Sequence, residues 1–347
     1  MNDFLEHLNI RYDKSLSKEQ KEYIYSVIKY QEECIISRER CKDLLSSYLC
    51  DILHEEVIKS DFKNKETPVL ICVVKNERIR MEYFFEHYRK IGISQFSIID
   101  NNSSDGTKEI CSVQDDVNLF SVDTEYSSAR RVGWINQILT KYGRDRWYLL
   151  VDADELIDYV GSEEYTINHL IDKIKQQGGT RVLGLQVDFY PKEKLFSMKD
   201  DNIEWDKCVY FDYDTYIEQD SKRCVWFVGG PRKRVLNTFS LLTKYPLFYY
   251  DSSTLNISSH YLYPFDSNLS MPCILCIKHY EFINEKDYEK MKIVVEKGIY
   301  ASKSREYVEM LEKIDKKRDL SFYDDIYSSK YTSSNDLLKV KYICDWK

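Results

Sequence analysis

Two carboxylates stand two residues apart in the sequence V-D-A-D-E at 151–155. In extended backbone, residues i and i+2 point the same way, so Asp152 and Asp154 can converge on one cation. Mg²⁺ typically takes one or two carboxylates together with phosphate oxygens, and a metal held in this way can neutralise charge on a departing phosphate group. An acidic turn at a strand end is common without any such role. The apolar run that precedes it, W-Y-L-L at 147–150, favours a metal site here.

Two further polar clusters come after apolar runs earlier in the chain. Lys75, Asn76 and Glu77 come directly after the apolar run 69–74, and D-N-N-S-S-D-G-T at 100–107 comes after 95–99. Taken alone, the second cluster is ordinary turn chemistry. Ligands of parallel α/β sheets collect at the carboxyl ends of the strands. We therefore expect all three clusters to meet at one edge of a sheet.

The elements that must position these clusters alternate at βαβ spacing. Apolar runs at 69–74, 95–99, 117–122 and 147–151 predict strands, and segments at 81–91, 108–111 and 127–142 predict helices. Uninterrupted apolar strands are typical of a parallel sheet covered on both faces. The pattern predicts an α/β fold with a mainly parallel central sheet and flanking helices. Further on we expect a helix at 165–177, strands at 181–189, 225–228 and 273–280, and long loops or an insertion over 190–225.

The first 66 residues are expected to be helical. S-K-E-Q at 17–20 is a capping-box pattern, and apolar residues continue at helical spacing as far as Leu53. This predicts one or two long helices that serve packing or dimerisation rather than catalysis. The expected organisation is a helical extension at 1–66, an α/β domain at 67–283, and an amphipathic helical region with a tail at 284–347.

Composition excludes several classes of protein. The net charge of −8, from 58 acidic and 50 basic residues, disfavours a nucleic-acid binder, which usually carries a basic excess. No apolar run is long enough for a transmembrane helix, and the first residues show no signal peptide. The ten cysteines stand mostly in apolar contexts, which suggests a reducing compartment and hence the cytoplasm. Cys273 and Cys276 form a lone C-x-x-C, which favours a structural role over zinc or redox chemistry.

Taken together, V-V-K-N-E at 73–77, I-D-N-N-S-S-D-G-T at 99–107 and V-D-A-D-E at 151–155 resemble the motifs of the GT-A glycosyltransferases. The resemblance is to the family 2-like branch related to glycosyltransferase family 92, and it covers about residues 68–300. It implies a Rossmann-like GT-A fold with helical additions. It also implies metal-dependent, inverting transfer of a hexose from a nucleotide diphosphate sugar, with a UDP-hexose as the donor. The acceptor would be a saccharide or lipid-linked glycan in bacterial surface glycan synthesis.

The resemblance also assigns roles to individual residues. The nucleotide would be bound by Lys75, Asn76, Glu77, Asp100 and Asn101, whereas D-G-T at 105–107 would shape its loop. Among these residues, Asp100 could accept from the base and the asparagine amides could contact the ribose.

Mn²⁺ or Mg²⁺ would be held by Asp152 and Asp154, with Glu155 orienting the loop and Asp152 also facing the donor. K-H-Y at 278–280 stands where the branch usually has N-H-Y, and it supplies His279 as the third metal ligand. G-P-R-K-R-V at 230–235 loosely matches a basic segment, so Arg232 or Arg234 would meet a phosphate.

Arg130 and Arg131 open the helix before the metal-binding strand. Arginine suits a diphosphate, and a solvated helix face is an equal alternative for each. An inverting transfer also needs a base that deprotonates the acceptor. The sequence offers Asp188 first, since it ends a predicted strand that faces the cleft, and His260 as its main competitor. The remaining candidates are Asp212, Asp214 and Asp251.

Three other functions share some of these features. A D-x-D phosphohydrolase places its nucleophilic aspartate after the first strand, whereas this motif comes after the fourth. A sugar nucleotidyltransferase would have a glycine-rich loop near the first strand, where this chain has K-N-E-R. A non-catalytic sugar-binding protein would be marked by loss of the metal aspartates. Lipid-linked acceptors would bring the chain to the inner membrane face, where the basic residues at 313–318 could contribute, although a solvated helix end is commoner.

Overall fold

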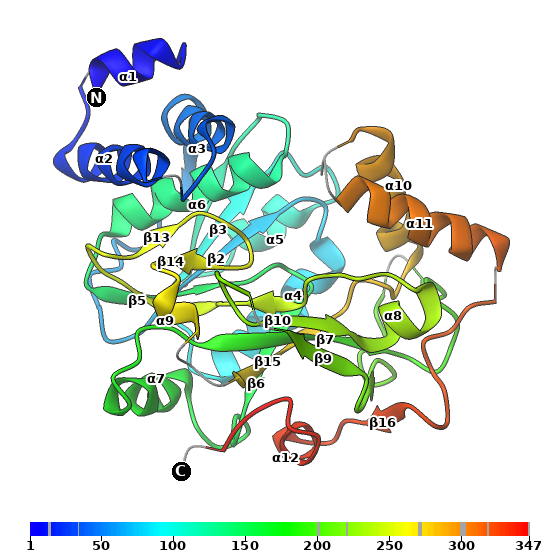
Figure 1. Ribbon diagram of the computed structural model, residues 1–347. Coiled ribbons are helices and arrows are strands. Elements are labelled where there is room, and N and C mark those ends of the chain that lie inside the picture. Colours follow the sequence, from blue (N-terminus) through cyan, green and yellow to red (C-terminus); the bar gives the residue numbers. More distant parts are fainter. Residues whose placement is uncertain are drawn as a thin grey trace.

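The protein has a mixed α/β fold built around two sheets (Figure 1). The structure is a computed structural model. The residues it describes are 1–12, 15–33, 35–199, 202–219, 221–269, 273–298, 303–317 and 319–345.

The first sheet has four parallel strands at its centre and an antiparallel strand at each edge. The parallel pairs are β2 with β3, β3 with β4, and β2 with β5. Its six strands, in spatial order, are β1 (His54–Val57), β4 (Val117–Ser121), β3 (Phe96–Asp100), β2 (Val69–Val74), β5 (Arg146–Leu150) and β12 (Leu247–Tyr250). The central strands are buried, as expected from their apolar runs.

The direction in which strands are added to this sheet reverses between β2 and β5. The chain places β3 and β4 successively on one side of β2, and then returns through α6 (Ser128–Tyr142) to place β5 on the other side. The connection that follows β2 and the connection that follows β5 therefore lead away in opposite directions. This leaves a crevice at the carboxyl ends of β2 and β5. Lys75 comes after β2 and Asp152 after β5, so two of the three polar clusters lie at the crevice.

The second sheet begins directly after the acidic motif. Residues 151–154 connect β5 to β6, so the motif stands where the two sheets meet. In this sheet β15 runs parallel to β7 and antiparallel to β6. Its strands, in spatial order, are β16 (Ser328–Lys330), β8 (Tyr210–Asp212), β7 (Leu183–Tyr190), β15 (Cys273–His279) and β6 (Glu155–Tyr159), and β11 (Thr243–Lys244) pairs with β7.

Residues 190–225 contain more regular structure than the sequence predicts. They include β8 and also β9 (Tyr216–Gln219), which pairs with β10 (Trp226–Gly229). These strands are short and partly exposed, so no apolar period marks them in the sequence. A second small ribbon joins β13 (Leu255–Asn256) to β14 (Leu262–Tyr263).

The helices surround the two sheets (Figure 1). The amphipathic helical region expected within 284–347 contains α10 (Glu285–Glu296) and α11 (Lys303–Lys316). The helices outside the N-terminal region and α6 are α4 (Arg78–Lys90), α5 (Thr107–Ser112), α7 (Ile167–Gln176), α8 (Gly230–Leu236), α9 (Asp266–Leu269), α10 (Glu285–Glu296), α11 (Lys303–Lys316) and α12 (Ser334–Lys339).

The N-terminal segment forms three helices, α1 (Asn2–His7), α2 (Lys18–Glu32) and α3 (Arg38–Cys50). The capping box at the start of α2 is confirmed: Ser17 Oγ accepts from the Gln20 amide at 3.2 Å, and Gln20 Oε1 accepts from the Ser17 amide at 2.8 Å. Helical structure ends at Cys50, and the prediction that it extends further was wrong. His54–Val57 instead pairs with β4, because an edge strand of the first sheet remained open to it.

Helix α3 packs closely on α6, which in turn packs on β2 (Figure 1). A Cβ atom at Gly133 would lie 2.1 Å from Ser47 Oγ, so only glycine permits this approach. The apolar faces of α1, α2 and α3 share a core with Val132, Leu255 and Ile257. The N-terminal helices are therefore packed on the body of the protein.

Among the described residues, no helix is long and apolar enough to cross a bilayer. Cys276 is buried in β15, in keeping with a structural role. Cys34 lies outside the described residues, as does the side chain of Cys273.

Candidate active site

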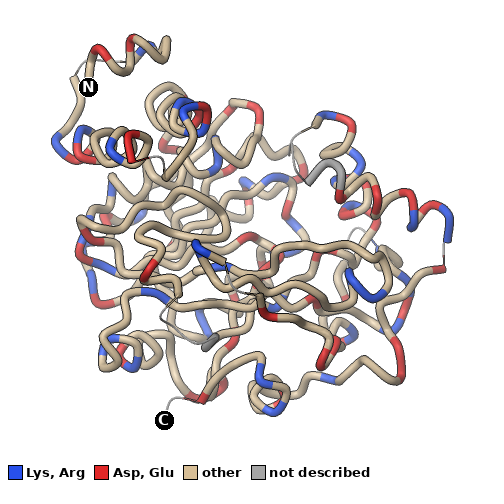
Figure 2. Tube along the Cα trace, in the orientation of Figure 1, with Lys and Arg blue, Asp and Glu red and all other residues tan. Residues whose placement is uncertain are grey.

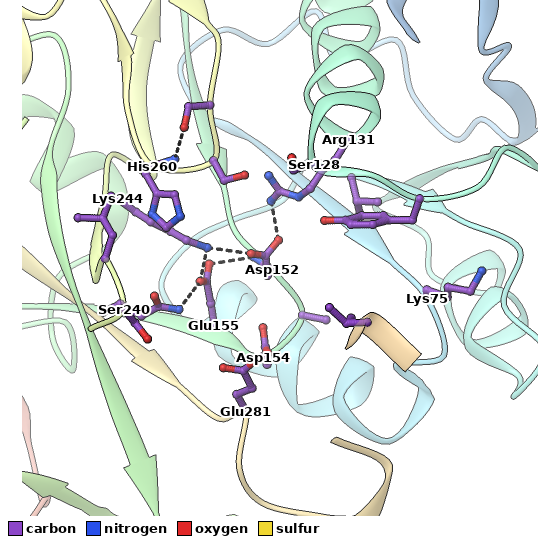
Figure 3. A pocket seen from close by; sticks show the side chains of 18 of the residues that line it. Lys75, Ser128, Arg131, Asp152, Asp154, Glu155, Ser240, Lys244, His260 and Glu281 are labelled. Atoms are coloured by element: carbon purple, nitrogen blue, oxygen red, sulfur yellow. Dashed lines mark hydrogen bonds and ion pairs between the residues drawn. The ribbon is translucent and has the colours of Figure 1, made fainter. Parts of the chain in front are cut away.

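A cleft of about 890 Å³ opens at the crevice between β2 and β5. Residues 73–77, Asn101 and residues 152–155 line it, and the other walls come from the α2–α3 connection, residues 257–261 and α10. Figure 3 shows Lys244 and His260 on one side of this cleft and Lys75 on the other, with the acidic turn between them.

Asp152 is held by two cations. Its Oδ1 accepts from Arg131 Nη2 at 2.5 Å, and its Oδ2 accepts from Lys244 Nζ at 2.8 Å (Figure 3). Burial alone would raise the pKa of Asp152, but Arg131 and Lys244 outweigh burial and hold that pKa well below its usual range. The sequence predicted that Asp152 is a metal ligand, whereas in the structure both of its carboxylate oxygens accept hydrogen bonds from Arg131 and Lys244.

Glu155 fixes the shape of the acidic turn from inside the protein. Its side chain is fully buried, and its Oε2 accepts from the Asp152 amide at 3.0 Å. Its Oε1 accepts from Gln186 Nε2 at 3.0 Å and also contacts Lys244 Nζ. Lys244 thus joins Asp152 to Glu155, because β11 lies beside β7 at this level of the second sheet.

Asp154 and His279 face each other across the junction of the sheets. His279 Nε2 lies 3.6 Å from Asp154 Oδ2, and the Tyr280 amide donates to Asp154 O at 3.0 Å. The pairing of β15 with β6 sets His279 directly opposite Glu155. Although burial opposes protonation, Asp154 and Asp188 raise the pKa of His279 above its usual value.

The Asp154–His279 pair fits a divalent cation. A separation of 3.6 Å is compatible with two ligands of one metal ion at about 2.1 Å each. Metal-binding histidines usually have the second ring nitrogen fixed by a carboxylate; Asp188 Oδ1 lies 3.0 Å from His279 Nδ1, and Arg232 Nη2 lies 2.7 Å from the same nitrogen. Among the described residues, no group of three or more His, Cys, Asp or Glu side chains is arranged as a metal site. Within the described part of the chain, Asp154 and His279 are the facing pair, Glu281 Oε2 lies 4.0 Å from His279 Nε2, and substrate or water would supply further ligands.

Asp188, the first candidate for the base, is a buried partner of Arg232. Arg232 donates to both carboxylate oxygens, at 2.8 and 2.6 Å, and lies 3.3 Å from Glu281. Burial would raise the pKa of Asp188, but Arg232 and His279 lower it to about 2. Asp188 is 1% exposed and is absent from the cleft lining. This environment is wrong for a base that must reach an acceptor, and we correct the prediction: Asp188 positions His279.

His260 lines the cleft. Its Nδ1 lies 3.0 Å from the carbonyl oxygen of Thr243, which can only accept, so the proton of the neutral ring belongs on Nδ1. Nε2 of that tautomer is the basic nitrogen. Figure 3 shows the ring beside Lys244.

The first two polar clusters are tied to each other by hydrogen bonds. Asn76 has a left-handed φ of 56°, its amide donates to Ser103 Oγ at 2.9 Å, and its Oδ1 accepts from the Ser104 amide at 2.8 Å. The Glu77 amide donates to Thr107 Oγ1 at 2.8 Å. The second cluster therefore shapes the first, while Lys75, Asn76 and Glu77 line the cleft.

Asp100 and Asn101 were expected to bind the nucleotide, but their positions are less suited to that role than those of residues 75–77. Asp100 is buried, accepts from the Ser103 amide at 3.0 Å, and borders a separate cavity of about 420 Å³. Asn101 lines the main cleft, but its amide nitrogen is used by Val122 O and Thr124 O. The structure therefore leaves Asp100 outside the cleft that holds the acidic turn.

Several other candidates also lie away from the cleft. Arg130 donates to Glu125 O at 2.9 Å on the protein surface, and unlike Arg131 it does not line the cleft. Arg234 forms an ion pair with Asp212, and Asp251 caps the turn at Ser253. Asp214 is likewise absent from the lining. Of the candidates for the base, only His260 lines the cleft.

Sequence reasoning missed the cations that the fold brings in from distant segments. Lys244 stands on a two-residue strand, and Lys290 contacts Glu77 from α10. No motif marks either lysine, since long-range packing alone places them.

The cleft is cationic in an acidic protein. Its described lining has eight Lys or Arg residues and six Asp or Glu residues, whereas the whole chain carries −8. Elsewhere the two signs are mixed along the chain (Figure 2). The balance of charge at the cleft favours an anionic ligand.

Comparison with known proteins does not assign this chain to a group, since no protein-family model and no curated protein matches it.

Proposed function

We propose that this protein is a metal-dependent, inverting glycosyltransferase of the GT-A type. It would transfer a hexose from a nucleotide diphosphate sugar, a UDP-hexose, to a saccharide or lipid-linked glycan acceptor. The observation that carries the proposal is the position of the Asp152–Asp154 turn. It lies at the strand-order reversal, in a cationic cleft shared with Lys75, Asn76 and Glu77.

The charges of the cleft support a diphosphate ligand. Asp154 and His279 would hold Mn²⁺ or Mg²⁺, which stabilises the negative charge of a leaving diphosphate when bound. Lys290 lies in the same cleft beside Glu77, where it can meet a phosphate. Arg131 and Lys244 keep Asp152 ionised and fixed, so the turn is rigid before the substrate arrives.

His260 is the base of the proposed reaction. The acceptor hydroxyl attacks the anomeric carbon as the bond from that carbon to the diphosphate oxygen breaks, and the hydroxyl proton passes to His260 Nε2. The Thr243 carbonyl holds the ring in the tautomer that this step needs. Asp188 does not touch the substrate in this proposal. It acts through His279, whose ring it orients.

The setting of the proposed reaction is suggested by the same chemistry. UDP-sugars and lipid-linked acceptors meet at the cytoplasmic face of a bacterial inner membrane, where a surface glycan would be assembled. A sugar nucleotidyltransferase, a D-x-D phosphohydrolase and a non-catalytic sugar-binding protein remain the alternatives to be separated by experiment.

Thermal stabilisation and donor hydrolysis test the proposal. UDP or GDP should raise Tm only with Mn²⁺ or Mg²⁺ present, and a panel of UDP- and GDP-sugars should reveal slow metal-dependent hydrolysis of one donor. Asp154→Ala should abolish both effects. Asp172→Ala, at an exposed position on α7, is the matched control and should change neither. Absence of any Tm shift with every nucleoside diphosphate tried would overturn the proposal, and release of inorganic phosphate from a phosphomonoester would favour a phosphohydrolase.

A further inference from the structure

The wall of the cleft next to His260 is built by two segments outside the sheets. One is the α2–α3 connection with the first turn of α3, and the other is residues 257–261. They are joined where Arg40 Nη2 donates to Ile257 O at 3.0 Å. The N-terminal helices, expected to serve packing or dimerisation, therefore contribute to the lining of the cleft.

Two arginines stand in this wall without a carboxylate partner among the described residues. Arg40 bonds the Ile257 carbonyl, and Arg223 Nη1 donates to Tyr261 Oη at 3.0 Å. Neither forms an ion pair within the described part of the chain. In contrast, Arg131, Arg232 and Lys244 in the same cleft each pair with a carboxylate. A guanidinium group has five N–H donors, so both arginines keep donors for a ligand.

The surroundings of Arg40 make an anion favourable there. Burial lowers the pKa of Arg40, and Asp43 opposes that effect only from beyond ion-pairing distance. Ser37 caps the N-terminus of α3 through the Arg40 amide and lines the cleft itself. The positive end of a helix of 13 residues thus faces the same space as a partly buried cation. Two independent features therefore favour a negative charge at one place.

This place is separate from the acidic turn. Lys244 reaches Asp152, the adjacent Thr243 carbonyl bonds His260, and the arginines contact Ile257 and Tyr261 on either side of His260 in the chain. His260 thus belongs to the segment 257–261 that both arginines contact, and its ring is bonded to the residue next to Lys244. A ligand at the arginines would present its hydroxyl to His260, as an acceptor must.

We propose that the acceptor is an anion, and that Arg40 and Arg223 bind its carboxylate or phosphate group. This inference rests on the proposed transferase function and names the class of acceptor. The carboxylate would belong to an acidic sugar, and the phosphate to a phosphate-linked carrier. Specificity for charge would arise from the N-terminal helices together with residues 257–261.

The test compares pairs of probes in which one member carries an added carboxylate or phosphate group, by calorimetry or ligand-observed NMR on the full chain. Methyl glucuronide is paired with methyl glucoside, and glycerol 3-phosphate with glycerol. We expect at least one anion to bind about tenfold or more tightly than its neutral partner, since hydrogen bonds to charged groups are strong. A preference in the first pair identifies an acidic sugar, and a preference in the second identifies a phosphate group.

Substitutions then assign the preference to the arginines. Arg40→Gln and Arg223→Gln should each reduce the preference, Arg40→Lys should keep part of it, and Arg38→Gln should leave it unchanged. Arg38 is the matched control, because it is exposed at the start of the same helix and absent from the cleft lining. Thermal unfolding of each variant confirms that it is folded.

The binding of UDP with Mn²⁺, measured on the same samples, separates two kinds of failure. If UDP binds and no anion is preferred, the inference is wrong and the transferase proposal stands. If the glutamine variants weaken UDP binding instead, the arginines serve the donor, and the inference is again wrong. If UDP does not bind under any metal condition, the proposed function fails, and the acceptor inference fails with it.

Discussion

The carboxylate of Asp188 lies 3.0 Å from His279 Nδ1 while it receives two hydrogen bonds from Arg232. The three side chains come from β7, α8 and β15, and each is nearly inaccessible to solvent. This buried arrangement fixes the orientation of the one imidazole that faces Asp154.

Asp188→Asn should destabilise the protein by about 3 kcal/mol, because removal of one member of a buried ion pair leaves the other charge uncompensated. Denaturant unfolding measures this change. The variant should also bind Mn²⁺ more weakly in the presence of UDP, since His279 loses its fixed orientation. Asp172→Asn on α7 is the control and should have little effect. Unchanged stability and unchanged metal affinity would contradict the positioning role.

Acidification should remove the contribution of the same carboxylate. The pKa of Asp188 falls from about 3.9 in an unfolded chain to about 2 in the folded protein. A depressed pKa stabilises the fold above the unfolded value, and that stabilisation is lost as the pH falls from about 4 toward 2. The free energy of unfolding should therefore decline over this window, and less steeply in Asp188→Asn. Parallel declines in the two proteins would show that Asp188 is not responsible.

His260→Gln should separate chemistry from donor binding. Loss of a general base costs about 10²–10⁴-fold in rate, so kcat for transfer should fall by that factor. The Kd of UDP with Mn²⁺ should not change, because the proposed metal ligands are Asp154 and His279, and His260 is held by the Thr243 carbonyl. The pH–rate profile should also lose its acidic limb, which a merely structural histidine would not cause. Full transfer activity in the variant would exclude His260 as the base.

Gly133→Ala should loosen the N-terminal helices from α6. The new methyl group would meet Ser47 Oγ at 2.1 Å and the Tyr48 amide nitrogen at 2.9 Å. Overpacking of this kind typically costs about 1–3 kcal/mol. Limited proteolysis should then cut within residues 1–50 faster than in the wild type. Gln137→Ala is a control, since Gln137 donates to Asp51 O on the same interface without such close packing. Equal proteolysis rates in Gly133→Ala and the wild type would contradict this account.

The parallel strands were predictable because burial on both faces leaves an uninterrupted apolar run. Val69–Val74 was predicted at its observed bounds, and the polar residues after β2 and β5 do meet at the reversal of the sheet. Strand β6 was missed, because the acidic residues at its start conceal it in the sequence. Apolar runs in the sequence thus show where the parallel strands end. They do not reveal an antiparallel strand such as β6, which begins soon after β5 ends.

The remaining parts of the site depend on contacts between distant segments. Lys244 and His260 reach the cleft from antiparallel pieces whose register no local pattern encodes. Asp188 was expected at the end of a strand but lies inside β7, two residues before its end, and its pairing with Arg232 comes from a helix that the sequence did not mark. Sequence reasoning therefore located the acidic turn but ranked Asp188 above His260 as the base, whereas His260 is the one of these two that lines the cleft.

Strand β5 leads directly into β6 through the acidic turn, and this connection matters for the design of truncated recombinant fragments. Asp152 and Asp154 stand near the middle of the chain, whereas Arg40, His260 and His279 line the same cleft from positions more than a hundred residues away on either side. A recombinant fragment that starts after residue 66 would keep the whole acidic motif yet lack one wall of the cleft. We expect useful expression boundaries to retain the N-terminal helices, and domain-swapped chimeras to respect the same unit.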